Sequence, residues 1–227
     1  MHKRVSRLAL AIGASLLASA PGFTVPTTFH LMQIEQVIGG VQGDTTLQAI
    51  QLRMRLFGQN MTSEGRLRAW DANGANPVVI MDSETDVPNG NGGDRVLFAT
   101  AAFAAAFGPT PDFVMTNPIP PAYLAAGKLT WESDTGVVVW GLAWGGANYT
   151  GTNTGTMDND ADGNFNPPFP GVLQSATNQS VLFPGAFSAP STNNAADYIL
   201  NPNNAVFTNN AGQTGSVPVE LMGFTVR

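Results

Sequence analysis

The sequence contains no cysteine and only two histidines, which narrows the chemistry open to it. Without cysteine there is no disulfide, no thiolate metal site and no cysteine nucleophile. Beyond the first residues the one histidine is His30, so a histidine-based zinc site is excluded by count. A Ser-His-Asp system would have to use His30, and no Gly-x-Ser-x-Gly elbow or P-loop is present. We therefore interpret His30 as a partly buried strand residue.

Charge is also scarce: 11% of the residues are charged, whereas 43% are hydrophobic. This composition excludes a disordered chain and a helical bundle, which needs many Glu, Lys and Arg residues on its surface. The surface must instead consist of Asn, Thr, Ser, Gln and Gly, which are typical of turns and strands. Without Lys3, Arg4 and Arg7, the ten basic residues become seven against sixteen acidic ones, a formal charge of −9. Such an acidic chain repels phosphate backbones, so we expect no nucleic-acid partner.

The longest apolar run is Leu8–Ala20, and it follows three basic residues. A basic start before a short apolar run is typical of a signal peptide, which we assign to residues 1–22. Cleavage after Ala20 or before Phe23 fits this pattern; a buried N-terminal helix is the alternative. The run is too short to span a bilayer, and no other segment is suited to it. We expect a bacterial protein that is extracellular or on the cell surface, with no transmembrane segment in the mature chain.

Alternating patterns predict β-strands along most of the chain. The clearest strand is 49–57, where Ile50, Leu52, Met54 and Leu56 alternate with Gln51, Arg53 and Arg55. This period of two predicts one buried face and one face in water. Turn signals occur at 71–74 and 133–136, the second with Gly136 at a positive-φ position. Further strands are predicted at 29–38, 66–70, 77–81, 129–132, 137–142, 180–183, 205–208 and 217–226.

One segment, Asp94–Phe107, is alanine-rich and lacks internal glycine and proline. Phe103 and Phe107 lie four residues apart and would share a helical face, so we predict a short helix at about residues 100–107. Short strands separated by Gly, Pro, Asn and Thr favour two packed antiparallel sheets. The predicted fold class is all-β: an immunoglobulin-like antiparallel β-sandwich with one short helix.

Several short motifs occur in an order similar to that of a known family. They are Gly93–Thr100 leading into Ala and Phe residues, Pro111-Asp112-Phe113, Val139–Gly145, Ser191–Tyr198 and Asn209–Gly212. In this order the chain resembles secreted bacterial proteins related to the lamin tail domain, an immunoglobulin-like β-sandwich. Gln48–Leu52 stands where better-known members carry an acidic strand with tryptophan. The resemblance implies a non-catalytic module and supplies no active-site residues.

We divide the chain into a signal peptide at 1–22, a lamin-tail-like β-sandwich domain at 23–215, and a C-terminal strand or tail at 216–227. The tail holds Pro218–Val226, which resembles a "PVEL-x-x-F" segment near the ends of secreted bacterial proteins. It has no apolar span or basic cluster after it, so it is no anchor by itself. Both readings, a last edge strand and a sorting feature, stay open.

The sharpest local motif lies in a long stretch at 145–170 that is rich in Gly, Asn, Thr and Asp. Asp158, Asp160, Asp162 and Asn164 alternate, and Gly163 permits a tight turn. This spacing matches the first half of a calcium loop, so these four residues are the candidate calcium ligands. The twelfth position, which is a bidentate Glu in an EF-hand, is Phe169. The alternative is a solvated turn in a loop that is merely mobile.

The remaining polar and aromatic residues leave two other functions open. Acidic residues such as Glu35, Glu64, Glu132 and Asp134 could supply the carboxylate pair of a secreted glycan hydrolase, although no spacing singles out a pair. Asp82, Glu84 and Asp86 favour a solvated face over a metal site. Trp131, Trp140 and Trp144 would form a sugar-stacking platform if exposed, as in a carbohydrate-binding module, or core residues if buried. The leading prediction is a non-catalytic module whose partner is an extracellular protein or a glycan.

Overall fold

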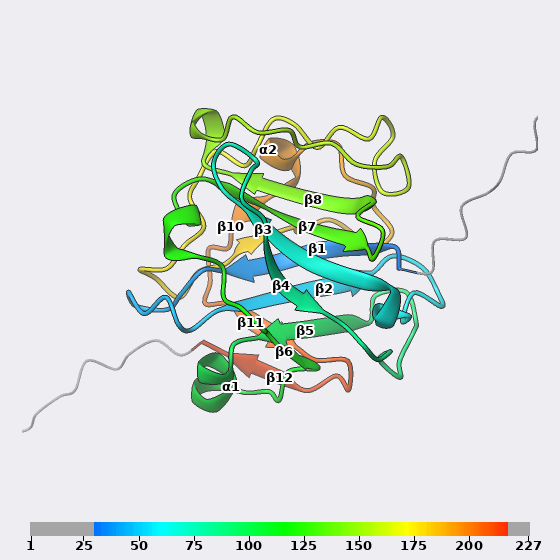
Figure 1. Cartoon of the computed structure of the whole chain (residues 1–227). Helices are drawn as coiled ribbons and strands as arrows, with labels where there is room; N and C mark the ends of the chain where they lie inside the picture. The colour runs from blue at the N-terminus through cyan, green and yellow to red at the C-terminus, as the bar shows by residue number, and fades with distance from the viewer. Residues whose placement is uncertain (1–29, 218–227) are drawn as a thin grey trace, which may run out of the picture.

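The computed structural model describes residues 30–217, and two β-sheets packed face to face dominate it (Figure 1). In sheet order, the six-stranded sheet consists of β10 (Ile199–Leu200), β9 (Val181–Leu182), β1 (Met32–Ile38), β2 (Ala49–Met54), β5 (Arg95–Ala99) and β6 (Phe113–Val114). The four-stranded sheet consists of β4 (Val78–Asp82), β3 (Gly65–Trp70), β7 (Gly127–Ser133) and β8 (Val138–Trp144). A separate hairpin joins β11 (Val206–Thr208) to β12 (Thr214–Ser216).

The helices are few and short. Within residues 30–217 they are α1 (Ala101–Phe107), α2 (Asn194–Asp197) and three 3-10 turns, η1 (Thr62–Glu64), η2 (Pro121–Tyr123) and η3 (Gly146–Asn148). All strand pairs are antiparallel except β5 with β6. The predicted all-β sandwich with one short helix at about residues 100–107 is confirmed, and α2 adds a single further turn.

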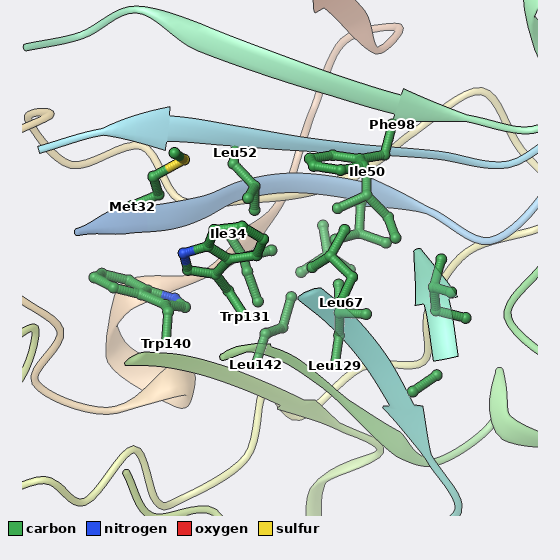
Figure 2. Packing of buried hydrophobic residues seen from close by; sticks show 14 of the residues in the cluster. Met32, Ile34, Ile50, Leu52, Leu67, Phe98, Leu129, Trp131, Trp140 and Leu142 are labelled. Carbon is green, nitrogen blue, oxygen red and sulfur yellow. The ribbon is translucent and has the colours of Figure 1, made fainter. Parts of the chain in front are cut away.

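The core between the sheets is built from alternate residues of the central strands (Figure 2). Ile50 and Leu52 of β2 face Trp131 of β7 and Trp140 of β8, and all four are fully buried. Trp131 and Trp140 are also direct cross-strand partners. Burial of such large side chains supplies much of the folding free energy, at about 25 cal/mol per Å² of apolar surface. Trp144 is buried in the same core, so these tryptophans are core residues and form no exposed sugar platform.

Both predicted turns occur where expected. Gly136 has φ of 85° and closes the β7–β8 hairpin, where its amide bonds to the Ser133 carbonyl. Gly74 has φ of 68° between β3 and β4. Only glycine adopts such angles without strain, which is why these local signals are reliable.

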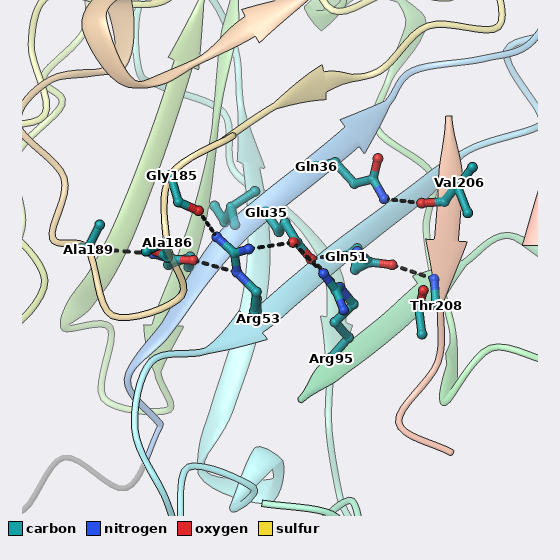
Figure 3. Close-up of polar contacts among 12 residues, drawn as sticks. Glu35, Gln36, Gln51, Arg53, Arg95, Gly185, Ala186, Ala189, Val206 and Thr208 are labelled. Atoms are coloured by element: carbon teal, nitrogen blue, oxygen red, sulfur yellow. Dashed lines mark hydrogen bonds and ion pairs between the residues drawn. The ribbon is translucent and has the colours of Figure 1, made fainter. Parts of the chain in front are cut away.

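The face of β2 that we expected to be in water is buried, so that expectation is wrong. Gln51 is 1% exposed, and Leu56, placed on the buried face by the alternation, is 54% exposed. The C-terminal part of the chain covers this outer face and forms a third layer with the β11–β12 hairpin (Figure 3). The polar side chains of β2 therefore meet protein partners rather than solvent.

The segment before α1 is a strand, β5, which the alanine-rich pattern did not reveal. Arg95–Ala99 pairs with β2 along its whole length and is buried from Val96 to Ala99. Thr100 then caps α1, accepting a hydrogen bond of 3.2 Å from the Phe103 amide. Phe103 packs edge-on against Phe207 of the hairpin, which joins α1 to the third layer.

The long stretch at 145–170 runs along the free edge of β8. Its backbone bonds to β8 at both ends, from the Thr156 amide to Val138 and from the Phe169 amide to Ala143, each at 2.9 Å. Asn194 of α2 completes this edge: its side chain donates to the Gly141 carbonyl and accepts from the Ala143 amide. The segment thereby shields a strand edge that would otherwise be open to pairing with another chain.

The predicted signal peptide at 1–22 and most of the predicted C-terminal strand or tail lie outside the described residues. Within the described part, no helix has both the length and the apolar character needed to cross a lipid bilayer.

Candidate functional site

The most polar buried region lies on the outer face of the six-stranded sheet, and a β-bulge creates it. The pairing of β1 with β2 shifts between Ile34 and Gln36, so Glu35 is an extra residue in β1. A bulge of this kind re-aims side chains. Glu35 and Gln36 consequently both lie on the outer face, beneath the C-terminal layer (Figure 3).

Glu35 is almost fully buried, and both its carboxylate oxygens are satisfied. Arg95 forms two parallel hydrogen bonds with it, Nε to Oε2 at 2.7 Å and Nη2 to Oε1 at 3.0 Å. Arg53 Nη1 lies 2.9 Å from Oε1, and Gln51 Nε2 donates to Oε2 at 2.6 Å. A buried carboxylate is tolerated only when paired and hydrogen-bonded in this way.

Arg53 and Arg95 differ in the contacts that their guanidinium groups make apart from those with Glu35. Arg53 donates to the Gly185 carbonyl and to Gln33, so it holds the C-terminal layer against the sheet. The side chain of Arg95 is 35% exposed, and within residues 30–217 its Nη1 has no hydrogen bond or ion pair. The hydrogen bonds that Arg95 donates to Glu35 raise the pKa of Arg95, so its guanidinium stays charged. One carboxylate and two guanidinium groups leave this cluster with one positive charge.

A pocket of about 370 Å³ opens over Glu35, Gln51 and Arg95. Its walls include the amide side chains of Asn203 and Asn204, and Leu182 and Val206 supply apolar surface. The side-chain amides of these two asparagines make no hydrogen bond to the described part of the chain. No aromatic ring of residues 30–217 lines the pocket, so a ligand would be held by hydrogen bonds and charge rather than by stacking.

Of the acidic residues considered for hydrolysis, Glu64 and Asp134 are neighbours, with the Asp134 amide donating to the Glu64 carbonyl at 3.1 Å, whereas Glu35 and Glu132 are separated. Glu132 lies on the outer face of the other sheet, fully buried and paired with Arg66 and Arg68. Glu35 and Glu132 are therefore on opposite outer faces of the sandwich and cannot flank one glycosidic bond. Asp82, Glu84 and Asp86 are exposed, as their pattern predicted.

The candidate calcium ligands occupy different environments. Asp160 is buried, Asp158 is half-buried, and Asp162 and Asn164 are exposed. Asp158 Oδ2 accepts a bond from Thr156, and Asn164 Oδ1 accepts two from Asn166. Asp160 and Asp162 interact directly: burial raises the pKa of Asp160, and the Asp162 carboxylate raises it further. Within residues 30–217 no group of three or more His, Cys, Asp or Glu residues is arranged to hold a metal ion.

His30 lies in a turn just before β1 rather than in a strand. Its ring stands edge-on to Trp131, and burial lowers its pKa, which keeps it neutral. Its Nδ1 has no hydrogen-bond partner within residues 30–217.

The comparisons with known proteins find no matching family model and no matching curated protein. The resemblance to the lamin tail domain therefore stays a prediction.

The pocket itself was missed by sequence reasoning. Its residues come from β1, β2, β5, β9 and the segment at 201–208, so no local motif marks it. The signal that could have pointed to it is Glu35, the one charged residue of β1, which needs a cationic partner if the strand is buried.

Proposed function

We propose that this chain is an exported, non-catalytic β-sandwich module that binds an acidic extracellular glycan in the pocket over Glu35 and Arg95. Export rests on the basic and apolar order of residues 1–22. A non-catalytic role fits the commitment of Glu35 and Glu132 to structural ion pairs. It also agrees with what the lamin-tail resemblance implies.

The ligand assignment rests on one observation. The positive charge of Arg95 is not fully neutralised, and it lies in the same pocket as the side-chain amides of Asn203 and Asn204, which make no hydrogen bond within residues 30–217. Arg95 Nη1 can donate to a carboxylate, and the amides of Asn203 and Asn204 can both donate to and accept from hydroxyl groups. A carboxylate on a polyhydroxylated ring matches this set. The pocket volume is at the lower end of the range for small-ligand sites, which suits one or two sugar units better than a protein surface.

The test compares uronic-acid-containing oligosaccharides with their carboxyl-reduced forms, using calorimetry on the purified mature chain. We expect the acidic sugars to bind and the reduced forms to bind at least tenfold more weakly, because a hydrogen bond to a charged group contributes about 1.5–3 kcal/mol. Equal affinity for both forms would contradict the role of Arg95. Binding to a protein partner but to no sugar would contradict the ligand class.

A pair of variants locates the site. Asn203→Ala combined with Asn204→Ala removes the uncommitted amides of one exposed and one half-buried asparagine, and we expect about a tenfold loss of affinity with unchanged folding. Asn91→Ala is the matched control, because Asn91 is an exposed asparagine that does not line the pocket. Chromatography of the sugars after long incubation tests the absence of catalysis: shortened products would show a hydrolase.

A further inference from the structure

The loop that carries the alternating aspartates is closed and anchored. The Gly155 amide donates to the Gly163 carbonyl at 2.8 Å, and Thr154 bridges Asn164 at the base. Gly163 has φ of 68°, and a Cβ there would lie 2.6 Å from the Gly155 oxygen, so only glycine fits. This confirms the tight turn expected at this position.

A buried asparagine in the middle of the loop fixes its position. Asn159 Nδ2 donates to the Val139 carbonyl of β8 at 2.8 Å, and the Asn159 carbonyl accepts from the Ser191 amide at 2.7 Å. Arg55 bonds to Asn159 Oδ1 and to the Asp158 carbonyl. These contacts hold the following residue, Asp160, against the body of the protein.

Asp160 carries a buried oxygen that lacks a partner. The residue is 3% exposed, and Oδ1 accepts a bond of 2.9 Å from the Asp162 amide. Its Oδ2 is buried and has no hydrogen bond within residues 30–217. Within residues 30–217, the acidic residues that form ion pairs are Glu35 and Glu132. No arginine or lysine of these residues therefore neutralises Asp160. Leaving a buried carboxylate oxygen unpaired is costly, which indicates that something else occupies this position.

The nearby carboxylate of Asp162 indicates that the group bound at Asp160 Oδ2 is a cation. The Asp162 amide donates to Asp160 Oδ1, so the loop holds a second carboxylate two residues away from the unpaired oxygen, and that carboxylate raises the pKa of Asp160. We propose that a calcium ion binds between the Asp160 and Asp162 carboxylates and that water and loop oxygens complete its shell. Calcium prefers oxygen ligands and tolerates irregular geometry. Asp158 and Asn164, whose side chains are engaged elsewhere, are left out of the ligand pair, so binding is weak, with Kd of about 1 mM.

Thermal denaturation of the mature chain at pH 7.5 tests this site. At 10 mM calcium, a Kd of about 1 mM should raise the midpoint by about 3–6 °C relative to EGTA. Magnesium at the same concentration should have a smaller effect, because it demands near-ideal octahedral geometry. Identical midpoints in calcium and in EGTA would overturn the proposal and leave a proton shared by the two carboxylates.

Two variants assign the effect to these residues. Asp162→Asn, at an exposed position that does not threaten folding, should abolish the calcium-dependent shift, and so should Asp160→Asn. Glu84→Gln removes the same charge at an exposed site elsewhere and should leave the shift unchanged. A shift that persists in Asp162→Asn, or that disappears in Glu84→Gln, would show that calcium acts through general surface charge.

Discussion

Glu35 on β1 reaches across β2 to Arg95 on β5, and the two side chains are joined by a pair of hydrogen bonds of 2.7 and 3.0 Å. This contact ties together three neighbouring strands from their outer face. It also fixes the guanidinium that lines the pocket. The ion pair thus serves both the cohesion of the six-stranded sheet and the proposed ligand site.

Glu35→Gln should lower the free energy of unfolding by about 3–5 kcal/mol. The change keeps the size of the side chain but leaves Arg53, which is largely buried, and Arg95 close together without a counter-charge. Urea denaturation followed by tryptophan fluorescence measures the loss. Glu84→Gln, at an exposed position, should stay within about 0.5 kcal/mol of wild type. Similar values for the two variants would contradict a structural role for Glu35.

Leu52→Ala should cost about 2–5 kcal/mol, whereas Leu56→Ala should cost less than about 0.5 kcal/mol. Both leucines belong to the same alternating pattern, but Leu52 is fully buried between the sheets and Leu56 is 54% exposed beyond the end of β2. The same denaturation assay compares them. A large loss for Leu56→Ala would mean that the buried face extends past Met54.

Leu52 and Leu56 show how much of the fold could be predicted from the sequence. Alternation placed β2 and its inner face correctly as far as Met54, because the period of two depends only on local backbone geometry, but it extended the buried face to the exposed Leu56. The glycine turns were predicted for the same reason. The burial of the outer face of β2 was not predicted, because Gln51 and Arg53 are polar whether they contact water or buried partners. Their partners, such as Thr208 for Gln51, lie up to 157 positions away in the sequence.

Strand β5 and the pocket were missed for related reasons. Val96–Ala99 is buried on both faces, so it shows no alternation, and the alanines after it supported only the helix predicted at about residues 100–107. The pocket depends on a bulge at Glu35 and on a distant asparagine segment, neither of which leaves a local pattern. The aspartate motif was visible because its residues are consecutive, yet only the structure separates buried Asp160 from exposed Asp162.

The extracellular form of the protein should begin between about residues 19 and 27. Lys3, Arg4 and Arg7 followed by Leu8–Ala20 are the features that predict cleavage there. Expression of the full sequence in a bacterial host, followed by mass spectrometry of the culture medium, gives the N-terminus. Recovery of intact Met1 in the cytosolic fraction alone would contradict export.

Asn194→Ala should destabilise the protein by about 2–5 kcal/mol. The Ala143 amide and the Gly141 carbonyl are buried and bond to the Asn194 side chain at 2.8 and 2.9 Å. The variant leaves both groups without a hydrogen-bond partner, and each unsatisfied group costs about 1–3 kcal/mol. Asn193→Ala, which removes only the cap of α2, should cost about 1 kcal/mol. Equal losses measured by urea denaturation would show that Asn194 matters only through the helix.

Lys128 lies on the outer face of the four-stranded sheet in an environment that disfavours its charge. It is 6% exposed, its Nζ donates to the Thr152 carbonyl at 2.8 Å, and the ring of Trp70 lies 5.0 Å away. Burial lowers the pKa of Lys128 from 10.5 to about 8, against the opposing charge of Glu132. Keeping the amine protonated in the folded state at pH 7 therefore costs on the order of 3 kcal/mol.

Wild type should become more stable as the pH rises from 8 to 9.5. In this window the unfolded chain still holds the proton of Lys128 and the folded chain releases it, so the free energy of unfolding increases by about 1 kcal/mol per pH unit. No cysteine is present to titrate in the same range. Lys128→Met removes this titrating group and with it the rise; burial raises the pKa of Tyr149 and Tyr198, so the stability of the variant should fall slightly towards pH 9.5. Urea denaturation at pH 8.0, 8.75 and 9.5 gives both slopes, and equal slopes for the two proteins would contradict the lowered pKa.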